Sequence, residues 1–128
     1  MRPLAAVFCV TLVFSGAATA GEFSESQLRL ARAIGAVIRL SKTCEVPIPS
    51  GPIAAAMRAE KVPQSAMLDA KSAFRAEVQE QANTVAAIQA LRGSQGHSAS
   101  ALREDACAQL MQNYGPNGSA RRGLYQTR

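Results

Sequence analysis

Apolar residues recur at every third or fourth position through most of the chain, which is the period of an amphipathic α-helix. The first such segment follows Ser24, which forms an S-x-x-Q capping box with Gln27 at a helix start. Its apolar positions share one side of the helix: Leu30, Ile34, Val37, Ile38 and Cys44. We therefore expect a first helix from Ser24 to about Thr43, with Cys44 at its buried edge.

Prolines and glycines divide the rest of the periodic pattern into further helices. Residues 45–52 hold three prolines and cannot continue the first helix, because proline lacks an amide donor and favours an extended residue before it. Ser50 is placed to cap a short second helix over residues 53–61. The apolar stripe then predicts a long third helix over residues 64–92, with Gly93 as its stop.

The fourth helix is expected to begin after Ser98 or Ser100 and to end at Gly115 and Pro116. From residue 117 onward the sequence has turn residues and scattered basic charge but no period. The whole pattern predicts an all-α fold, a small bundle of about four helices. We assign residues 21–116 to this helical domain and residues 117–128 to a basic flexible tail.

Residues 1–20 have the form of a cleavable secretory signal, so they are set apart from the fold. Their apolar run covers residues 4–14 and is shorter than the ~20 residues that a transmembrane helix needs. Ala18 and Ala20 supply the small side chains that a signal peptidase accepts before a cut between Ala20 and Gly21. We expect the mature protein to lie in the periplasm, or to be secreted, and not to span a membrane.

The cysteines that remain after cleavage are Cys44 and Cys107, and an even pair in an exported chain predicts a disulfide bond. In the chain-entropy model, closing the loop between them would stabilise the fold by ~4 kcal/mol. A redox pair or a metal pair is the alternative. The sequence has no C-x-x-C, however, and His97 is the only histidine that could share a metal.

Charge adds one candidate surface. The full chain carries a formal charge of +5, and four cations lie on one arc of the first helix: Arg29, Arg32, Arg39 and Lys42. This arc could dock on an anionic envelope surface or an acidic partner protein, but the simpler interpretation is a solvated outer face. Export argues against a nucleic-acid partner. The tail has three arginines, placed on either side of Tyr125: Arg121, Arg122 and Arg128. They could form a weak electrostatic tether to an anionic partner, but the simpler interpretation is a soluble terminus.

Candidate catalytic residues are few. His97 is the sole histidine and lies in a Gly/Ser-rich turn, and Glu77 and Glu80 fit a solvated helix flank. The sequence contains no H-E-x-x-H, G-x-S-x-G or Walker motif. We therefore expect no catalytic, cofactor-binding or metal-binding residues. Of the three functions considered, an enzyme that uses His97 or a carboxylate ranks last.

An exported helical domain with one disulfide between an early and a late helix, through Cys44 and Cys107, resembles the layout of the small acid-stress chaperones of the bacterial periplasm. The resemblance implies a stress chaperone that exposes apolar surface on acidification, and this is our second hypothesis. The first is a periplasmic accessory or binding protein that presents a helical face to another protein or to the envelope, without catalysis.

Overall fold

The computed structural model describes residues 22–126, and the regular structure in that range is entirely helical. It consists of α2 (Glu25–Cys44), α3 (Ser50–Ala59), a short 3-10 helix η1 (Gln64–Met67), α4 (Ala73–Ser94) and α5 (Ala99–Tyr114). The predicted all-α bundle of about four helices is confirmed. The expected signal peptide, with its cut between Ala20 and Gly21, lies outside the described residues. Across residues 22–126, no helix combines the length and the apolar character that a membrane span requires.

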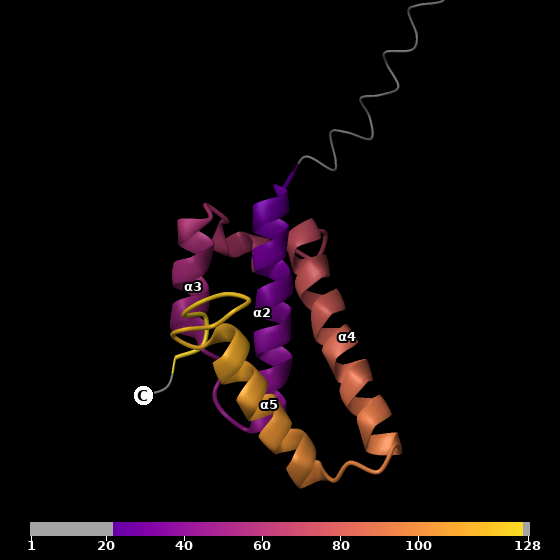
Figure 1. Ribbon diagram of the computed structural model, residues 1–128. Helices are drawn as coiled ribbons and strands as arrows, with labels where there is room; N and C mark the ends of the chain where they lie inside the picture. Colours follow the sequence, from indigo (N-terminus) through magenta and orange to yellow (C-terminus); the bar gives the residue numbers. More distant parts are fainter. Residues whose placement is uncertain (1–21, 127–128) are drawn as a thin grey trace, which may run out of the picture.

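Helix α2 lies at the centre of the bundle, with α3 and α4 on opposite sides and α5 crossing it (Figure 1). Its predicted capping box is confirmed. The Gln27 N–H donates to Ser24 Oγ at 3.1 Å, and the Ser24 N–H donates to Gln27 Oε1 at 2.9 Å, so both amides at the helix start are paired. The helix contributes the largest set of apolar side chains to the core: Leu30, Ala31, Ile34, Val37, Leu40 and Cys44.

Helices α2 and α4 approach each other closely at Gly35. A methyl group built at this position would overlap the carbonyl oxygen of Val78 on α4. At the start of α4, the side chain of Phe74 is fully buried, and its ring centroid lies 5.7 Å from that of Phe23. The aromatic pair and the close backbone contact together hold α4 against α2.

The predicted disulfide bond between Cys44 and Cys107 is confirmed. The two sulfur atoms are bonded, and the Cα atoms lie 5.0 Å apart, within the usual range for such a bond. The bond joins the C-terminal end of α2 to α5, so it connects two helices that are far apart in the sequence.

The long third helix that the sequence predicts is interrupted, because the chain turns between η1 and α4. Asp69 Oδ1 accepts a hydrogen bond from the Lys71 N–H at 2.9 Å, and Ser72 Oγ accepts one from the Arg75 N–H at 3.2 Å. The Asp69 bond stabilises a turn in place of a continued helix, and the Ser72 bond caps the start of α4. The apolar stripe continues through the turn, so the period alone did not reveal the break.

Two helix boundaries also differ from the prediction. Ser50 is the first residue of α3, and the capping position is taken by Pro49, which offers no side-chain hydrogen bond. Gly93 lies inside α4 and does not stop it. The residue that turns the chain is Gly96, whose φ of 100° is accessible to glycine at little cost.

Candidate functional site

The predicted basic arc of α2 does not face solvent as one surface, because α4 lies along it. Arg32 lies between two carboxylates, with Nη2 2.8 Å from Glu25 and Nη1 3.2 Å from Glu77 of α4. The Nε of Arg39 donates to the Gln89 side chain of α4 at 3.0 Å. The periodicity of the sequence could not show which neighbouring helix covers this side of α2.

The exposed members of the arc are Arg29 and Lys42, which lie towards opposite ends of α2. Two separated cations in water are largely screened from each other at physiological ionic strength. The structure therefore does not unite Arg29, Arg32, Arg39 and Lys42 into one exposed binding face.

The candidate catalytic residues also lie apart. His97 is exposed in the turn between α4 and α5, and its Nδ1 lies 3.1 Å from the carbonyl oxygen of Arg92. Glu77 is paired with Arg32, near the other end of α4. The rise of an α-helix places His97 more than ~20 Å from Glu77. In the part of the chain that the structure describes, no three His, Cys, Asp or Glu side chains gather in a way that could hold a metal ion.

Residues 115–126, which we call the C-terminal segment, fold back onto the bundle, so the expectation of a flexible tail is wrong for the described part of that tail. Leu124 is only 1% exposed and belongs to the hydrophobic core. The N–H groups of Gly123 and Tyr125 donate to the carbonyl groups of Gly115 and Tyr114, each at 2.8 Å. The burial of one leucine and the paired backbone stabilise the segment despite its scattered charges.

Glu60, at the end of α3, connects the C-terminal segment to the bundle. Its Oε2 lies 3.4 Å from the Arg121 guanidinium, and its Oε1 accepts a hydrogen bond from the Ser26 hydroxyl at 2.9 Å. The side chain of Gln27 donates to the Glu60 backbone carbonyl at 2.9 Å. The Glu60 and Arg121 side chains are only 25% and 28% exposed, so this network is better shielded from solvent than a surface ion pair.

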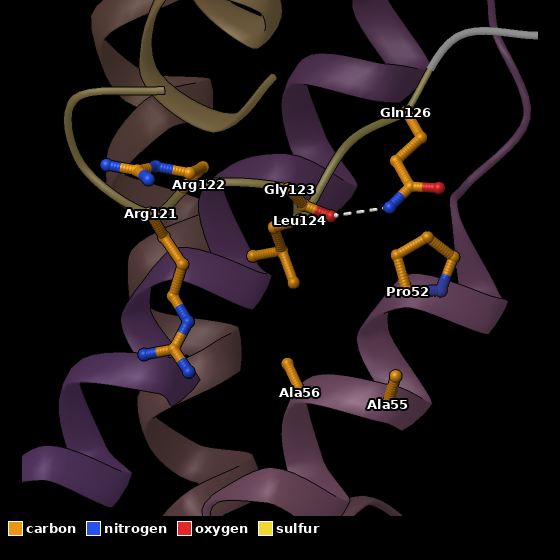
Figure 2. A pocket seen from close by; sticks show the side chains of 8 residues that line it. All are labelled: Pro52, Ala55, Ala56, Arg121, Arg122, Gly123, Leu124 and Gln126. Carbon is orange, nitrogen blue, oxygen red and sulfur yellow. Dashed lines mark hydrogen bonds between the residues drawn. The ribbon is translucent and has the colours of Figure 1, made fainter. Parts of the chain in front are cut away.

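A groove lies between the C-terminal segment, the start of α3 and the proline-rich stretch of residues 46–52, which we call the connector. The larger part, about 730 Å³, is lined by the connector together with Tyr125 and Gln126. The smaller part, about 360 Å³, lies between α3 and residues 121–126 (Figure 2). Because both parts share Pro52 and Gln126, we describe them as one connector groove. Their sizes fall within the ~300–1,000 Å³ that is usual for ligand sites.

The two ends of the connector groove differ in chemistry. The connector end is lined by three prolines, Tyr125 and an Ile48 side chain that is 42% exposed, together with the polar residues Ser50 and Gln126. The other end holds Arg121, which pairs with Glu60, and Arg122, which is exposed and makes no ion pair with any described residue. All residues lining the groove are described, and none is acidic. Figure 2 shows the Arg122 side chain directed away from the smaller hollow, so the arginine beside the hollow is Arg121, which pairs with Glu60.

Sequence reasoning identified the connector as a stiff segment and weighed the tail arginines around Tyr125, but it did not bring the two together. The available signals were Ile48 between two prolines and the pair Leu124 and Tyr125 within an otherwise polar segment. Apolar residues within polar segments indicate that their side chains are buried or contact another surface, although they do not identify that surface. Comparison of the chain with protein-family models, with curated proteins and with solved structures finds no match.

Proposed function

We propose that this protein is an exported, non-catalytic accessory or binding protein of the periplasm. The observation that carries the proposal is the connector groove, which is lined by three prolines and by the exposed side chain of Ile48. Both ends of the connector are anchored, since Cys44 precedes it in the disulfide bond and Ile53 follows it in the core. A surface that is fixed before binding loses little conformational entropy when a partner docks.

The disulfide bond supports export, because such bonds form and persist in oxidising compartments. Cell fractionation followed by mass spectrometry tests this part of the proposal. We expect a periplasmic chain that begins at Gly21 and carries an oxidised Cys44–Cys107 pair. Full-length chain with free thiols in the cytoplasm would contradict it.

Affinity capture from periplasmic extract, at low and at high salt, tests the binding function. We expect a partner that the wild-type protein enriches at both salt concentrations. The groove variant Ile48→Asp should lose that partner, whereas Arg29→Gln, an exposed change on α2, should keep it. An extract from which no partner is enriched at either salt concentration would contradict the proposal.

The same capture experiment distinguishes an anionic envelope surface as the partner. Such a surface would engage the exposed cations Arg29 and Lys42, and screening would weaken that interaction at high salt. Loss of binding in Arg29→Gln and at high salt, with Ile48→Asp unaffected, would identify this alternative.

A stress chaperone is the second candidate function, and exposed apolar side chains just after η1 and on α4 favour it. Leu68, Ile88 and Leu91 are 78%, 47% and 57% exposed, respectively. Exposed apolar side chains of this kind can bind unfolded clients. If the protein is a chaperone, it should suppress aggregation of an acid-unfolded client, and Leu91→Ser should weaken that suppression. Aggregation that proceeds unchanged at low pH would exclude this function.

A further inference from the structure

Helix α5 and the C-terminal segment form one structural unit, residues 98–126, which we call the arm. Among the described residues, every backbone hydrogen bond that the C-terminal segment donates ends on a carbonyl group of residues 111–115. The Ser119 N–H, for example, donates to the Gln112 carbonyl at 3.1 Å. The last carbonyl groups of a helix have no partner within it, so the segment pairs the groups that α5 leaves free.

The backbone of the arm is not bonded to the rest of the molecule. In the described chain, no backbone hydrogen bond joins residues 98–126 to residues 22–97. The arm is docked mainly through buried apolar side chains, and those that are at most 1% exposed are Ala106, Leu110 and Leu124. The docking therefore depends on a small apolar contact.

Ion pairs add little to this docking. Asp105 of the arm pairs with Arg92 of α4, and Arg103 of the arm pairs with Glu45 at 3.5 Å. The side chains of both pairs are between 39% and 71% exposed. Ion pairs at such exposed positions contribute little to stability. Of the ion pairs between the described residues, only that of Arg121 with Glu60 is better shielded.

The rest of the bundle is held together by contacts that do not involve the arm. Helices α2 and α4 pack through the Phe23–Phe74 ring pair and through the close approach at Gly35. Helix α3 joins α2 where the Gln27 side chain donates to the Glu60 carbonyl at 2.9 Å. These contacts need no residue of the arm, so α2, α3 and α4 can stay packed when the arm moves.

The arm is connected to α4 through an exposed turn. Every residue from 93 to 100 is exposed, and the φ of 100° at Gly96 is one that glycine adopts at little cost. Figure 1 shows α4 and α5 diverging from this turn, with α5 lying across α2. A few exposed residues can absorb the backbone rotation that a rigid-body movement requires. The turn therefore allows the arm to move without unfolding α4.

Within the described residues, the Cys44–Cys107 bond is the one covalent link between the arm and the rest, apart from the chain itself. Cys44 is 8% exposed and Cys107 is only partly buried, so Cys107 is the more accessible partner. A dithiol reduces the bond in two steps. One of its thiolates bonds to Cys107 Sγ, and Cys44 leaves as a thiolate that takes up a proton. The second thiolate then displaces Cys107, so the protein gains two electrons and two protons while the dithiol becomes a cyclic disulfide.

We infer that the Cys44–Cys107 bond is a redox switch, and that its reduction by a dithiol lets the arm swing about the turn at Gly96 as one unit while α2, α3 and α4 stay packed. Opening uncovers the apolar side chains of Leu110 and Leu124. It also removes residues 121–126 from the connector groove, so the proposed binding site exists only in the oxidised protein. This last consequence rests on the proposed function, whereas the movement of the arm does not.

Amide hydrogen exchange, followed by NMR at several low urea concentrations, tests the inference on the isotopically labelled protein with and without dithiothreitol. The bond restricts the opened arm, so its reduction should make the arm amides exchange about a hundredfold faster. In the reduced protein, the arm amides should also exchange at least about tenfold faster than those of α2 and α4. Their exchange should depend less on urea, because opening of the arm exposes only part of the surface.

A matched pair of variants, compared in the reduced protein, separates the arm from the rest. Leu110→Ala weakens the docking of the arm and should speed the exchange of arm amides by about tenfold or more. Gly35→Ala weakens the α2–α4 contact, which is the same whether the arm is closed or open, and should leave the arm rates unchanged. The double variant Cys44→Ser, Cys107→Ser should exchange like the reduced protein with or without dithiothreitol. If that variant does not fold, the reduced wild-type protein decides.

Two outcomes of the exchange experiment would overturn the inference. Arm amides whose rates do not respond to dithiothreitol would show that the bond does not hold the arm. A single exchange class in the reduced protein, with one urea dependence for the arm, α2 and α4, would show that the arm does not open separately.

Capture from periplasmic extract distinguishes this inference from the proposed function. Equal capture of a partner by the oxidised protein and by the double variant would exclude control of the groove by the bond, while the proposed function would stand. Failure of the oxidised protein to capture any partner would contradict the proposed function, but not the movement of the arm that hydrogen exchange measures.

Discussion

Gly35 shows how a single missing side chain determines the packing of two helices. In a helix interior, alanine is usually more stable than glycine by ~1 kcal/mol. At Gly35 the added methyl group would overlap the Val78 carbonyl of α4. We expect Gly35→Ala to lower the free energy of unfolding by ~1–3 kcal/mol, measured by urea denaturation, because the two helices must move apart.

Gly93 provides the control for this substitution. It also lies inside a helix, but a methyl group there would meet only Leu102 Cδ1, at an ordinary contact distance of 3.8 Å. Gly93→Ala should therefore stabilise the protein by up to ~1 kcal/mol. If both substitutions changed the free energy of unfolding by the same amount in the same direction, the result would contradict a role of Gly35 in the α2–α4 contact.

Tyr114, at the end of α5, makes stability depend on pH in the alkaline range. Burial raises the pKa of its phenol above the ordinary value of 10.0. The folded state therefore holds this proton more tightly than the unfolded state does. The stabilisation that this proton gives to the folded state is complete below about pH 10, and it is lost as the pH rises through the pKa of the folded state.

Tyr114→Phe removes this ionisable group while keeping the ring. Above about pH 10, the free energy of unfolding of the wild-type protein should fall more steeply with pH than that of the variant. Urea denaturation at a series of pH values measures both slopes. Parallel pH profiles would show that the Tyr114 phenol does not contribute.

At the scale of the elements, helix starts could be predicted from sequence because their signals are local. Ser24 begins α2 through Gln27, and Ser98 begins α5 by accepting a hydrogen bond from the Ala101 N–H at 3.0 Å. The break before α4 was missed because its apolar spacing matches that of a continuous helix. The C-terminal segment was missed because its docking depends on Glu60 and α3, which are about half the chain away.

The connector groove could not be predicted for the same reason. Its lining comes from residues 46–56 and 121–126, and no local period relates two segments so far apart. Only the stiffness of the connector and the presence of cations in the tail could be read from the sequence. Their proximity is a property of the folded chain.

Leu124 tests whether the C-terminal segment is an integral part of the fold. Replacing a fully buried leucine by alanine usually costs ~2–5 kcal/mol, and we expect Leu124→Ala to lower the free energy of unfolding by an amount in this range. Leu91→Ala is the matched control, since that side chain is 57% exposed on α4, and should cost no more than ~0.5 kcal/mol. Similar small losses in both variants would mean that the segment is not stably docked.

At the scale of the whole molecule, the disulfide bond supplements a core with few aromatic side chains. The bond joins residues separated by 63 positions, and such a closure stabilises a fold by ~4 kcal/mol in the chain-entropy model. The double variant Cys44→Ala, Cys107→Ala should lose a free energy of unfolding of that order in urea denaturation. Treatment of the wild-type protein with a reductant should produce a comparable loss, and a change below ~1 kcal/mol in both would contradict this role.

The same bond turns the chain between Cys44 and Cys107 into a covalent ring that contains all of α3, η1 and α4. One protease cut inside this ring, for example in the exposed turn at His97, opens it without releasing a fragment. The nicked protein should migrate as one species on a non-reducing gel and separate into two pieces only after reduction. A cut in this exposed turn therefore leaves the two pieces covalently joined.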